Sequence, residues 1–482
     1  MKLNDLQDAM GQIDDSLVTE AGRDRGKKKP PLWHKIGAVA AAIALVLTSF
    51  IIIQGTRLHK NNNRSDVMAL TSPEYPVIHM HPSEDLLSGS KSDQEAYDKA
   101  YSAWSDDFQR QRNQPQGYND GVVTLTRKAN RLLLTTDGEN RVYSPLNIYL
   151  SLSLLAETAG GDTREEILQV LGVDTIEMLR KKAGSLWQAH YMNDGQTTSL
   201  LANSIWFDNK LSIKKETMKI LQDVYKASAF QGDMSSAAMT EQLQKWLNEQ
   251  TDNLLESSVD NAGFDKDTLM ALASTILFRA KWNDEFNEGN TGKSTFHSPA
   301  GSVETDFMSE SSTNIYYWGD NFAAIGKGMT YSGNMWFFLP DEGVNVNELL
   351  DDPQVDAILQ NSVDYEHQKF LIVNFKVPKF DVMSEIQLGE AMQDLGITKA
   401  FTASADFSPT SEDAGLFVSD ASHAARVMID EKGVTGAAYT LIFCGAAMPP
   451  DETVDFVLDR PFLFVVQGHD RVPLFVGVVN HP

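Results

Sequence analysis

Two side chains of this 482-residue sequence have the chemistry of a hydrolase, Ser144 and His423, but neither stands in a motif that would activate it. A serine nucleophile needs a base within hydrogen-bonding reach, and the sequence contains neither Gly-x-Ser-x-Gly nor His-Glu-x-x-His. Ser144 precedes a proline, which is typical of a residue that caps a helix. Gly292-Lys293-Ser294 is no phosphate-binding loop, because Asn287 stands where the first glycine is needed. The sequence therefore predicts no enzyme.

Charge and composition argue against nucleic-acid binding, disulfide bonds and a metal site. The formal net charge is −25, which argues against nucleic acid because a phosphate-binding surface needs clustered lysine and arginine. Cys444 is the only cysteine, so neither a disulfide framework nor a cysteine-based zinc site is expected. His79 and His81 lie close together, but no other ligand stands near them in the sequence. We predict no metal and no cofactor.

The stretch 429–450, IDEKGVTGAAYTLIFCGAAMPP, has a different kind of chemistry. After a turn at Glu431-Lys432-Gly433, nearly every side chain up to Thr440 is small and none is charged. With the two-residue period of a strand, the run has one face of Val434, Gly436, Ala438 and Thr440 and another of Thr435, Ala437 and Tyr439. Such a segment can lie exposed and yet slide between two existing strands. It indicates a strand held in reserve; the alternative is a surface loop before a C-terminal hairpin.

The N-terminal region predicts a membrane anchor. Residues 36–53, IGAVAAAIALVLTSFIII, are long enough to cross a hydrocarbon layer as a helix and carry no charge. More basic residues precede this span than follow it, which favours a cytoplasmic tail at 1–35 and an extracellular location for the rest. The alternative is a signal peptide whose cleavage releases a secreted protein. Residues 54–118 are polar and contain scattered prolines, so we expect an extracellular stalk with a helix over 93–112.

From 119 to 482 the pattern is globular and resembles the serpin family. The turn and small residues from Glu431 resemble the hinge of a serpin reactive-centre loop, and Ser144-Pro145 resembles the entry to the helix behind the main sheet. The C-terminus carries both closing motifs, DRPFLF at 459–464 and PLFVGVVN at 473–480. Further matches follow one another at plausible spacing: 201–207, 245–251, 276–282 with Phe286, 337–342, 377–380, 395–397, 405–408 and 419–423. With the anchor, the sequence looks like a membrane-anchored, bacterial-type member.

The resemblance implies an α+β fold with three β-sheets, eight to nine helices and an exposed reactive-centre loop, preceded by a single transmembrane helix. It places the hinge at Glu431, Gly433 and the seven residues Val434 to Thr440. It also implies a set of residues that control opening of the main sheet: Asn140, Ser144, Asn147, Ser274, Trp282, Lys379 and His423. Lys379 is expected to pair with Glu431 at the top of that sheet.

In the hinge, Val434 replaces the usual threonine or serine and Tyr439 stands where alanine is commoner. Two further positions, near the place where the main sheet opens, also depart from the family pattern. Ser274 stands where asparagine is usual, and Asn147 stands where serine is usual. Because each side chain can form hydrogen bonds, the two changes could compensate for one another.

The function that the resemblance implies is suicide inhibition of serine proteases through a covalent acyl complex, by a protein expected to be a monomer. Family geometry places the cleaved bond after Ala447, with Met448 following; a shift by one residue to Met448 stays open. No lysine or arginine lies between Gly433 and Pro450, so the small residues there favour elastase- or subtilisin-like targets. The alternative is a non-inhibitory serpin that serves as a binding or scaffold protein on the cell surface.

Overall fold

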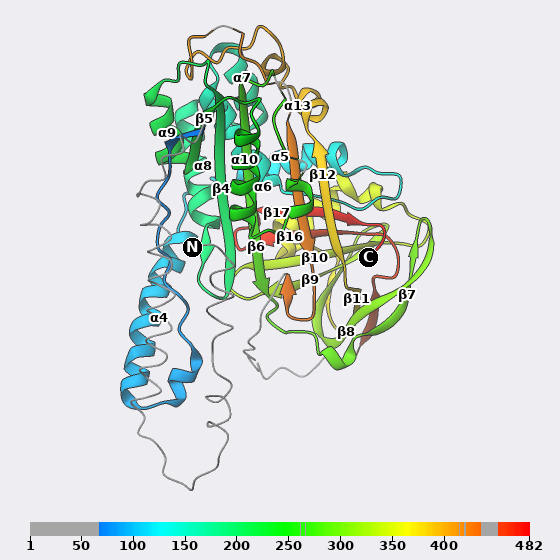
Figure 1. Cartoon of the computed structure of the whole chain (residues 1–482). Coiled ribbons are helices and arrows are strands. Elements are labelled where there is room, and N and C mark those ends of the chain that lie inside the picture. The colour runs from blue at the N-terminus through cyan, green and yellow to red at the C-terminus, as the bar shows by residue number, and fades with distance from the viewer. Residues whose placement is uncertain (1–66, 261, 266, 414, 419–420, 435–451) are drawn as a thin grey trace, which may run out of the picture. The chain divides into compact units, whose positions relative to one another are not determined.

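The computed structural model describes residues 67–482 except for 261, 266, 414, 419–420 and 435–451 (Figure 1). The predicted tail, the span 36–53, the hinge residues Thr435 to Thr440 and the bond between Ala447 and Met448 lie outside the described residues. Within the described part of the chain, no helix has the length and apolar character needed to cross a membrane.

Ten α-helices occur in the described residues, and nine of them belong to the region in which eight to nine were predicted. Five of them begin at a residue whose side chain accepts a hydrogen bond from the first turn, such as Ser144, Thr175 and Ser236. The helices are α4 Lys91–Arg112, α5 Asp120–Leu134, α6 Pro145–Thr158, α7 Gly161–Val170, α8 Ile176–His190, α9 Lys215–Tyr225, α10 Ala237–Thr251, α11 Glu256–Val259, α12 Pro353–Asn361 and α13 Gly389–Leu395. Short 3₁₀ turns are η2 Glu84–Ser88, η3 Glu288–Asn290, η4 Val346–Asp351, η5 Ser362–Asp364 and η6 Lys399–Phe401.

The described strands form three sheets. Sheet A, with the order β1-β5-β4-β6-β14 and β3 beside β4, contains β1 Val67–Thr71, β3 Met192–Asn193, β4 Thr197–Asp208, β5 Ala227–Gly232, β6 Met270–Lys281 and β14 Gly433–Val434. Sheet B, with the order β15-β11-β8-β9-β10-β16-β17-β2 and β7 beside β8, contains β2 Arg141–Tyr143, β7 Gly292–Ser298, β8 Gly301–Trp318, β9 Phe322–Met329, β10 Gly333–Pro340, β11 Gln368–Pro378, β15 Thr453–Val457, β16 Phe462–Gly468 and β17 Pro473–Val479. The third sheet is the antiparallel pair β12 Asp381–Gln387 and β13 Ser422–Met428.

Helix α6 lies in the centre of the core. Every residue of α6 except Ser151 is buried, because the helix contacts β6 of sheet A and β17 of sheet B. On the other face of sheet A, α10 covers β6, and Trp206 and Trp246 belong to a second, smaller core there (Figure 1). Sheet A is thus covered at β6 on both faces, by α6 on one and by α10 on the other.

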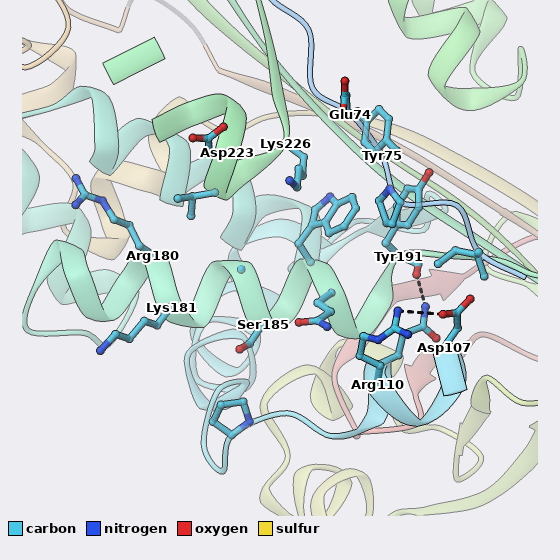
Figure 2. Close-up of a pocket in the computed structure, with 18 residues that line it drawn as sticks. Glu74, Tyr75, Asp107, Arg110, Arg180, Lys181, Ser185, Tyr191, Asp223 and Lys226 are labelled. Carbon is cyan, nitrogen blue, oxygen red and sulfur yellow. Dashed lines mark hydrogen bonds and ion pairs between the residues drawn. The ribbon is translucent and has the colours of Figure 1, made fainter. Parts of the chain in front are cut away.

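The predicted stalk needs correction, because residues 67–118 pack onto the folded domain. Strand β1 pairs with the edge strand β5, and the ring of Tyr75 stacks on Tyr191 with 5.4 Å between centroids. Helix α4 confirms the predicted helix, and its Trp104 is 2% exposed and donates to Asp194 Oδ2 at 2.7 Å. Figure 2 shows Tyr75 beside Tyr191, with Asp107 and Arg110 paired below them. The backbone ladder of β1 and the aromatic residues thus attach this segment to the domain, although most of its side chains are polar.

Candidate functional site

The hinge begins with a tight turn at the end of β13. Asp430 N–H donates to Gly433 O at 3.0 Å, and Asp430 Oδ1 accepts from the amides of Lys432 and Gly433 at 2.9 and 3.0 Å. Strand β14 then pairs antiparallel with β6, with Gly433 opposite Lys281 and Val434 opposite Ala280. Val434 also bridges Ile429, at the end of β13. Gly433, the last residue of the turn, and Val434 therefore already form an edge strand of sheet A.

Glycine is required at the first of these two positions by close approach of the backbone. A β-carbon on Gly433 would lie 2.2 Å from the carbonyl oxygen of Ala280, which is too close for any side chain. The next residue, Val434, is only 2% exposed. The sequence predicts that Gly433 and Val434 both belong to the hinge. The structure adds that the Val434 side chain packs in the hydrophobic core.

Strands β6 and β13, which flank β14, share no ladder of their own in the part of the chain that the structure describes. β13 pairs with β12 in a separate sheet, while β6 pairs with β4 along its length and with β14 at its end. Among the described residues, sheet A is therefore linked to the end of β13 only through Gly433 and Val434, the start of the hinge. This arrangement leaves backbone groups on both strands for an incoming segment to pair with.

Three consecutive carbonyl groups of the turn are held from one side. The indole of Trp282 donates to Asp430 O at 2.9 Å, and its amide donates to Lys432 O at 3.0 Å. The amide of Phe286 donates to Glu431 O at 2.9 Å. Because Trp282 is fully buried, these bonds fix the turn against the end of β6.

The predicted pairing of Lys379 with Glu431 is present, with 2.7 Å between Nζ and Oε1. The hydroxyl of Thr291 donates to the same carboxylate oxygen at 2.7 Å. Burial alone would raise the pKa of Glu431, but the hydrogen bonds from Lys379 and Thr291 outweigh it, so the pKa lies below its ordinary value. The carboxylate is therefore charged at neutral pH and holds the turn from its outer side.

The lowered pKa of Glu431 predicts acid sensitivity with a defined sign. A carboxyl whose pKa falls on folding stabilises the fold above its ordinary pKa, and this contribution disappears as pH drops through the lowered pKa. We expect thermal melts of the wild type to fall below about pH 4 more steeply than those of Glu431→Gln, which should already be less stable at pH 7. The exposed Glu342→Gln is the matched control and should follow the wild type. Identical pH profiles for wild type and Glu431→Gln would contradict the assignment.

A second cluster lies further down sheet A, where α6 begins. The hydroxyl of Ser274 lies in hydrogen-bond contact with Asn147 Oδ1 and, at 2.6 Å, with Asn203 Oδ1. Asn147 Nδ2 donates to the carbonyl of Ser274 at 3.1 Å, and Asn203 Nδ2 donates to Tyr225 O at 2.9 Å. The two residues that depart from the family pattern thus bond directly to one another, from α6 to β6. Asn203 belongs to the same network, and sequence reasoning missed it.

Ser144 and His423 are brought together, but not as a catalytic pair. His423 Nε2 accepts the amide proton of Ser144 at 3.0 Å, so this ring nitrogen carries no proton. Burial lowers the pKa of His423 to about 4, which keeps the ring neutral. The hydroxyl of Ser144 accepts from the amide of Asn147 at 3.2 Å and so caps α6, as predicted. The serine hydroxyl serves as a helix cap, and the histidine ring accepts a hydrogen bond from the backbone instead of activating a nucleophile.

The direct bond between positions 147 and 274 predicts that the two residues can be exchanged. Asn147→Ser or Ser274→Asn alone should lower the free energy of unfolding by about 1–3 kcal/mol, because each leaves a buried polar group unpaired. The double exchange should recover most of that loss, since it restores one amide and one hydroxyl. Urea unfolding of the four proteins measures the coupling, and simple addition of the two single effects would contradict it.

Asn140 requires a correction, since it lies apart from this cluster. Its side chain donates to His481 O at 2.5 Å and accepts from the amides of Asn480 and His481 at 2.6 and 2.9 Å. It therefore ties the entry of β2 to the C-terminus. The predicted grouping combined residues of three separate places: the turn (Trp282, Lys379), the α6 cluster (Ser144, Asn147, Ser274, His423) and the C-terminus (Asn140).

Metal ligands do not gather among the residues that the structure describes. His79 Nδ1 pairs with Asp107 Oδ2 at 2.8 Å, and His81 packs against the rings of Trp104 and Tyr331. His79 thus ties the chain before α4 to α4 itself, whereas His81 attaches the N-terminal segment to the domain through Tyr331 and a backbone bond to Asp194 O at 2.8 Å.

Comparison with known proteins assigns the fold. A family described as Serpin (serine protease inhibitor) matches residues 125–482. The chain belongs to the serpin family. Among curated serpins, Serpin-ZX of Arabidopsis thaliana is 27% identical over 75% of this chain and 96% of its own length. The horse alpha-1-antiproteinase 2 is 28% identical over 71% of this chain and 82% of its own length.

Solved serpins share the architecture. A serpin of Arabidopsis in its native stressed conformation has a TM-score of 0.67 at 25% identity and covers 76% of this chain and 99% of its own. The thermophilic serpin tengpin in its native state has a TM-score of 0.68 at 24% identity and covers 77% of this chain and 95% of its own. Serpins are in the main protease inhibitors and not enzymes, in agreement with the absence of a catalytic motif. The segment 67–118 precedes the residues that the family match covers.

Proposed function

We propose that this serpin is a suicide-substrate inhibitor of serine proteases. The observation that carries the proposal is the position of Gly433 and Val434, which start a strand between β6 and the end of β13. The protease serine attacks the carbonyl carbon of Ala447, and the amine of Met448 leaves with a proton, which yields an acyl-enzyme. Insertion of the freed segment into sheet A then carries the acylated protease away before water can hydrolyse the ester.

The residue before the cleaved bond determines which class of protease is inhibited. Ala447 is small and its neighbours are uncharged, which suits the shallow specificity pocket of an elastase- or subtilisin-like protease. A trypsin-like pocket requires lysine or arginine, and Phe443 lies too near the hinge to leave a full inserting strand for a chymotrypsin-like enzyme. Cleavage after Met448 is the second register.

We also propose that residues 36–53 anchor the protein in a membrane as one helix, with residues 1–35 in the cytoplasm and the serpin domain outside. The uncharged span and the basic residues before it support a membrane-anchored member with this orientation. The secreted form after signal cleavage is the alternative. Protease added to intact cells should remove the domain and leave the tail protected, and a protected domain would exclude this orientation.

One experiment tests the inhibitory function. The purified domain is incubated with elastase-, subtilisin-, chymotrypsin- and trypsin-like proteases, and covalent complexes are sought on denaturing gels. We expect complexes with the first two, and mass spectrometry should find a released C-terminal peptide that begins at Met448, or at Pro449 for the second register. Cleavage without any complex would support a non-inhibitory binding or scaffold protein instead.

A further inference from the structure

A buried ion pair lies behind the aromatic residues that hold the hinge. Lys327 on β9 has a side chain that is 6% exposed, and its ammonium group contacts both carboxylate oxygens of Glu310 at 2.9 and 2.7 Å. Glu310 lies on β8, and its side chain is 18% exposed. The ladder between β8 and β9 is confined to residues 316–318 and 323–325, so the pair spans a region where the two strands have separated. The pair therefore joins two strands that share no backbone hydrogen bonds there.

The same ammonium group faces the two rings that adjoin the turn. Lys327 Nζ lies 4.2 Å from the ring centroid of Phe286 and 5.7 Å from that of Trp282. The two rings meet edge to face, with 6.3 Å between centroids and 88° between planes. A cation attracts the faces of both rings, so its position restricts how each ring can tilt. The backbone amides of both residues and the indole of Trp282 donate to the carbonyls of Asp430, Glu431 and Lys432.

Stability alone does not explain a charged pair in this place. Burial lowers the pKa of Lys327, which shows that desolvation opposes the charge, and Glu310 offsets part of that effect. Replacement of a buried ion pair by apolar residues of similar volume is often neutral or stabilising. An apolar pair would fill the space beneath Phe286 as well, but it would exert no directional force on the rings.

We propose that Lys327 and Glu310 are positioning residues for loop insertion, which fix Trp282 and Phe286 so that the turn 430–433 is formed before cleavage. The inference rests on the proposed inhibitory function. Insertion competes with hydrolysis of the acyl-enzyme, so a turn that must first be ordered delays the strand and lets more inhibitor be cleaved without trapping protease. A purely structural pair would alter heat stability and leave this competition unchanged.

The test compares Lys327→Met/Glu310→Leu with the wild type in three measurements. Thermal melts should differ little, because the pair is removed as a unit. The number of inhibitor molecules consumed per protease trapped should rise several-fold. Hydrogen exchange at the amides of Trp282 and Phe286 should accelerate about tenfold, and this readout does not depend on any protease.

Lys376→Met is the matched control. Lys376 Nζ also lies over an aromatic ring, 5.3 Å from the centroid of Phe307, but that ring donates nothing to the turn. Lys376→Met should leave unchanged both the number of inhibitor molecules consumed per protease trapped and the hydrogen exchange at the amides of Trp282 and Phe286. Wild-type stoichiometry in the double variant, or unchanged exchange at both amides, would overturn the inference. If the wild type traps no protease at all, the proposed function fails, and the exchange measurement alone then decides whether the pair positions the turn.

Discussion

Val434→Glu should convert the protein from an inhibitor into a substrate. The valine side chain is 2% exposed and lies between Ala280 on β6 and Ile429 at the end of β13. A carboxylate there would be buried without a partner, which costs several kcal/mol. The side chain would stay outside the sheet, the strand would not start, and water would hydrolyse the acyl-enzyme first. On a denaturing gel with an elastase-like protease, complex should fall at least tenfold while cleaved inhibitor accumulates.

Lys432→Glu provides the control for this experiment. This substitution introduces a negative charge two residues earlier, at an exposed side chain of the same turn. The backbone amide of residue 432 can still donate to Asp430 Oδ1. It should trap protease as the wild type does. Ala438→Glu, four residues further along the same face of the predicted strand, should behave like Val434→Glu. Full trapping by Val434→Glu would rule out insertion from this point.

The sequence located the turn at which the hinge begins because the signal of that turn is local; the hinge residues 435–440 lie outside the described residues. A turn at Glu431-Lys432-Gly433 and a run of small residues can be read without knowing what surrounds them. The pairing of Lys379 with Glu431 came from the resemblance and is present in the structure. What could not be read is that β14 already occupies the sheet, since pairing with Ala280 joins residues that are far apart in the sequence.

The errors have a common physical origin in long-range contacts. Residues 67–118 look like a stalk because most of their side chains are polar, but the pairing of β1 with β5 and buried aromatic contacts of Tyr75 and Trp104 attach them to the domain. Asn140 was grouped with the α6 cluster through resemblance alone, and its partners turned out to be the last residues of the chain. Lys327 gave no signal, because a lone lysine in a strand is ordinarily solvated.

Cleavage of the loop should raise the melting temperature of the protein by tens of degrees. Strands β6 and β13 share no ladder among the described residues, so a segment that enters between them gains backbone hydrogen bonds on both sides. A dozen new bonds at a net ~1 kcal/mol each release on the order of 10 kcal/mol. That energy rivals the whole stability of an ordinary domain, ~5–15 kcal/mol, and is sufficient to deform a protease attached to the moving end.

Calorimetry of intact and loop-cleaved protein measures this gain directly. The cut is made with a protease that the inhibitor does not trap, so that no complex remains, and the fragments stay together because β15, β16 and β17 belong to sheet B. Cleaved Val434→Glu is the matched control and should melt close to its uncut form, because its strand cannot start. Superimposable curves for intact and cleaved wild type would mean that the native sheet stores no such energy. The turn at 430–433 would then be only a surface feature, and a binding role would replace inhibition.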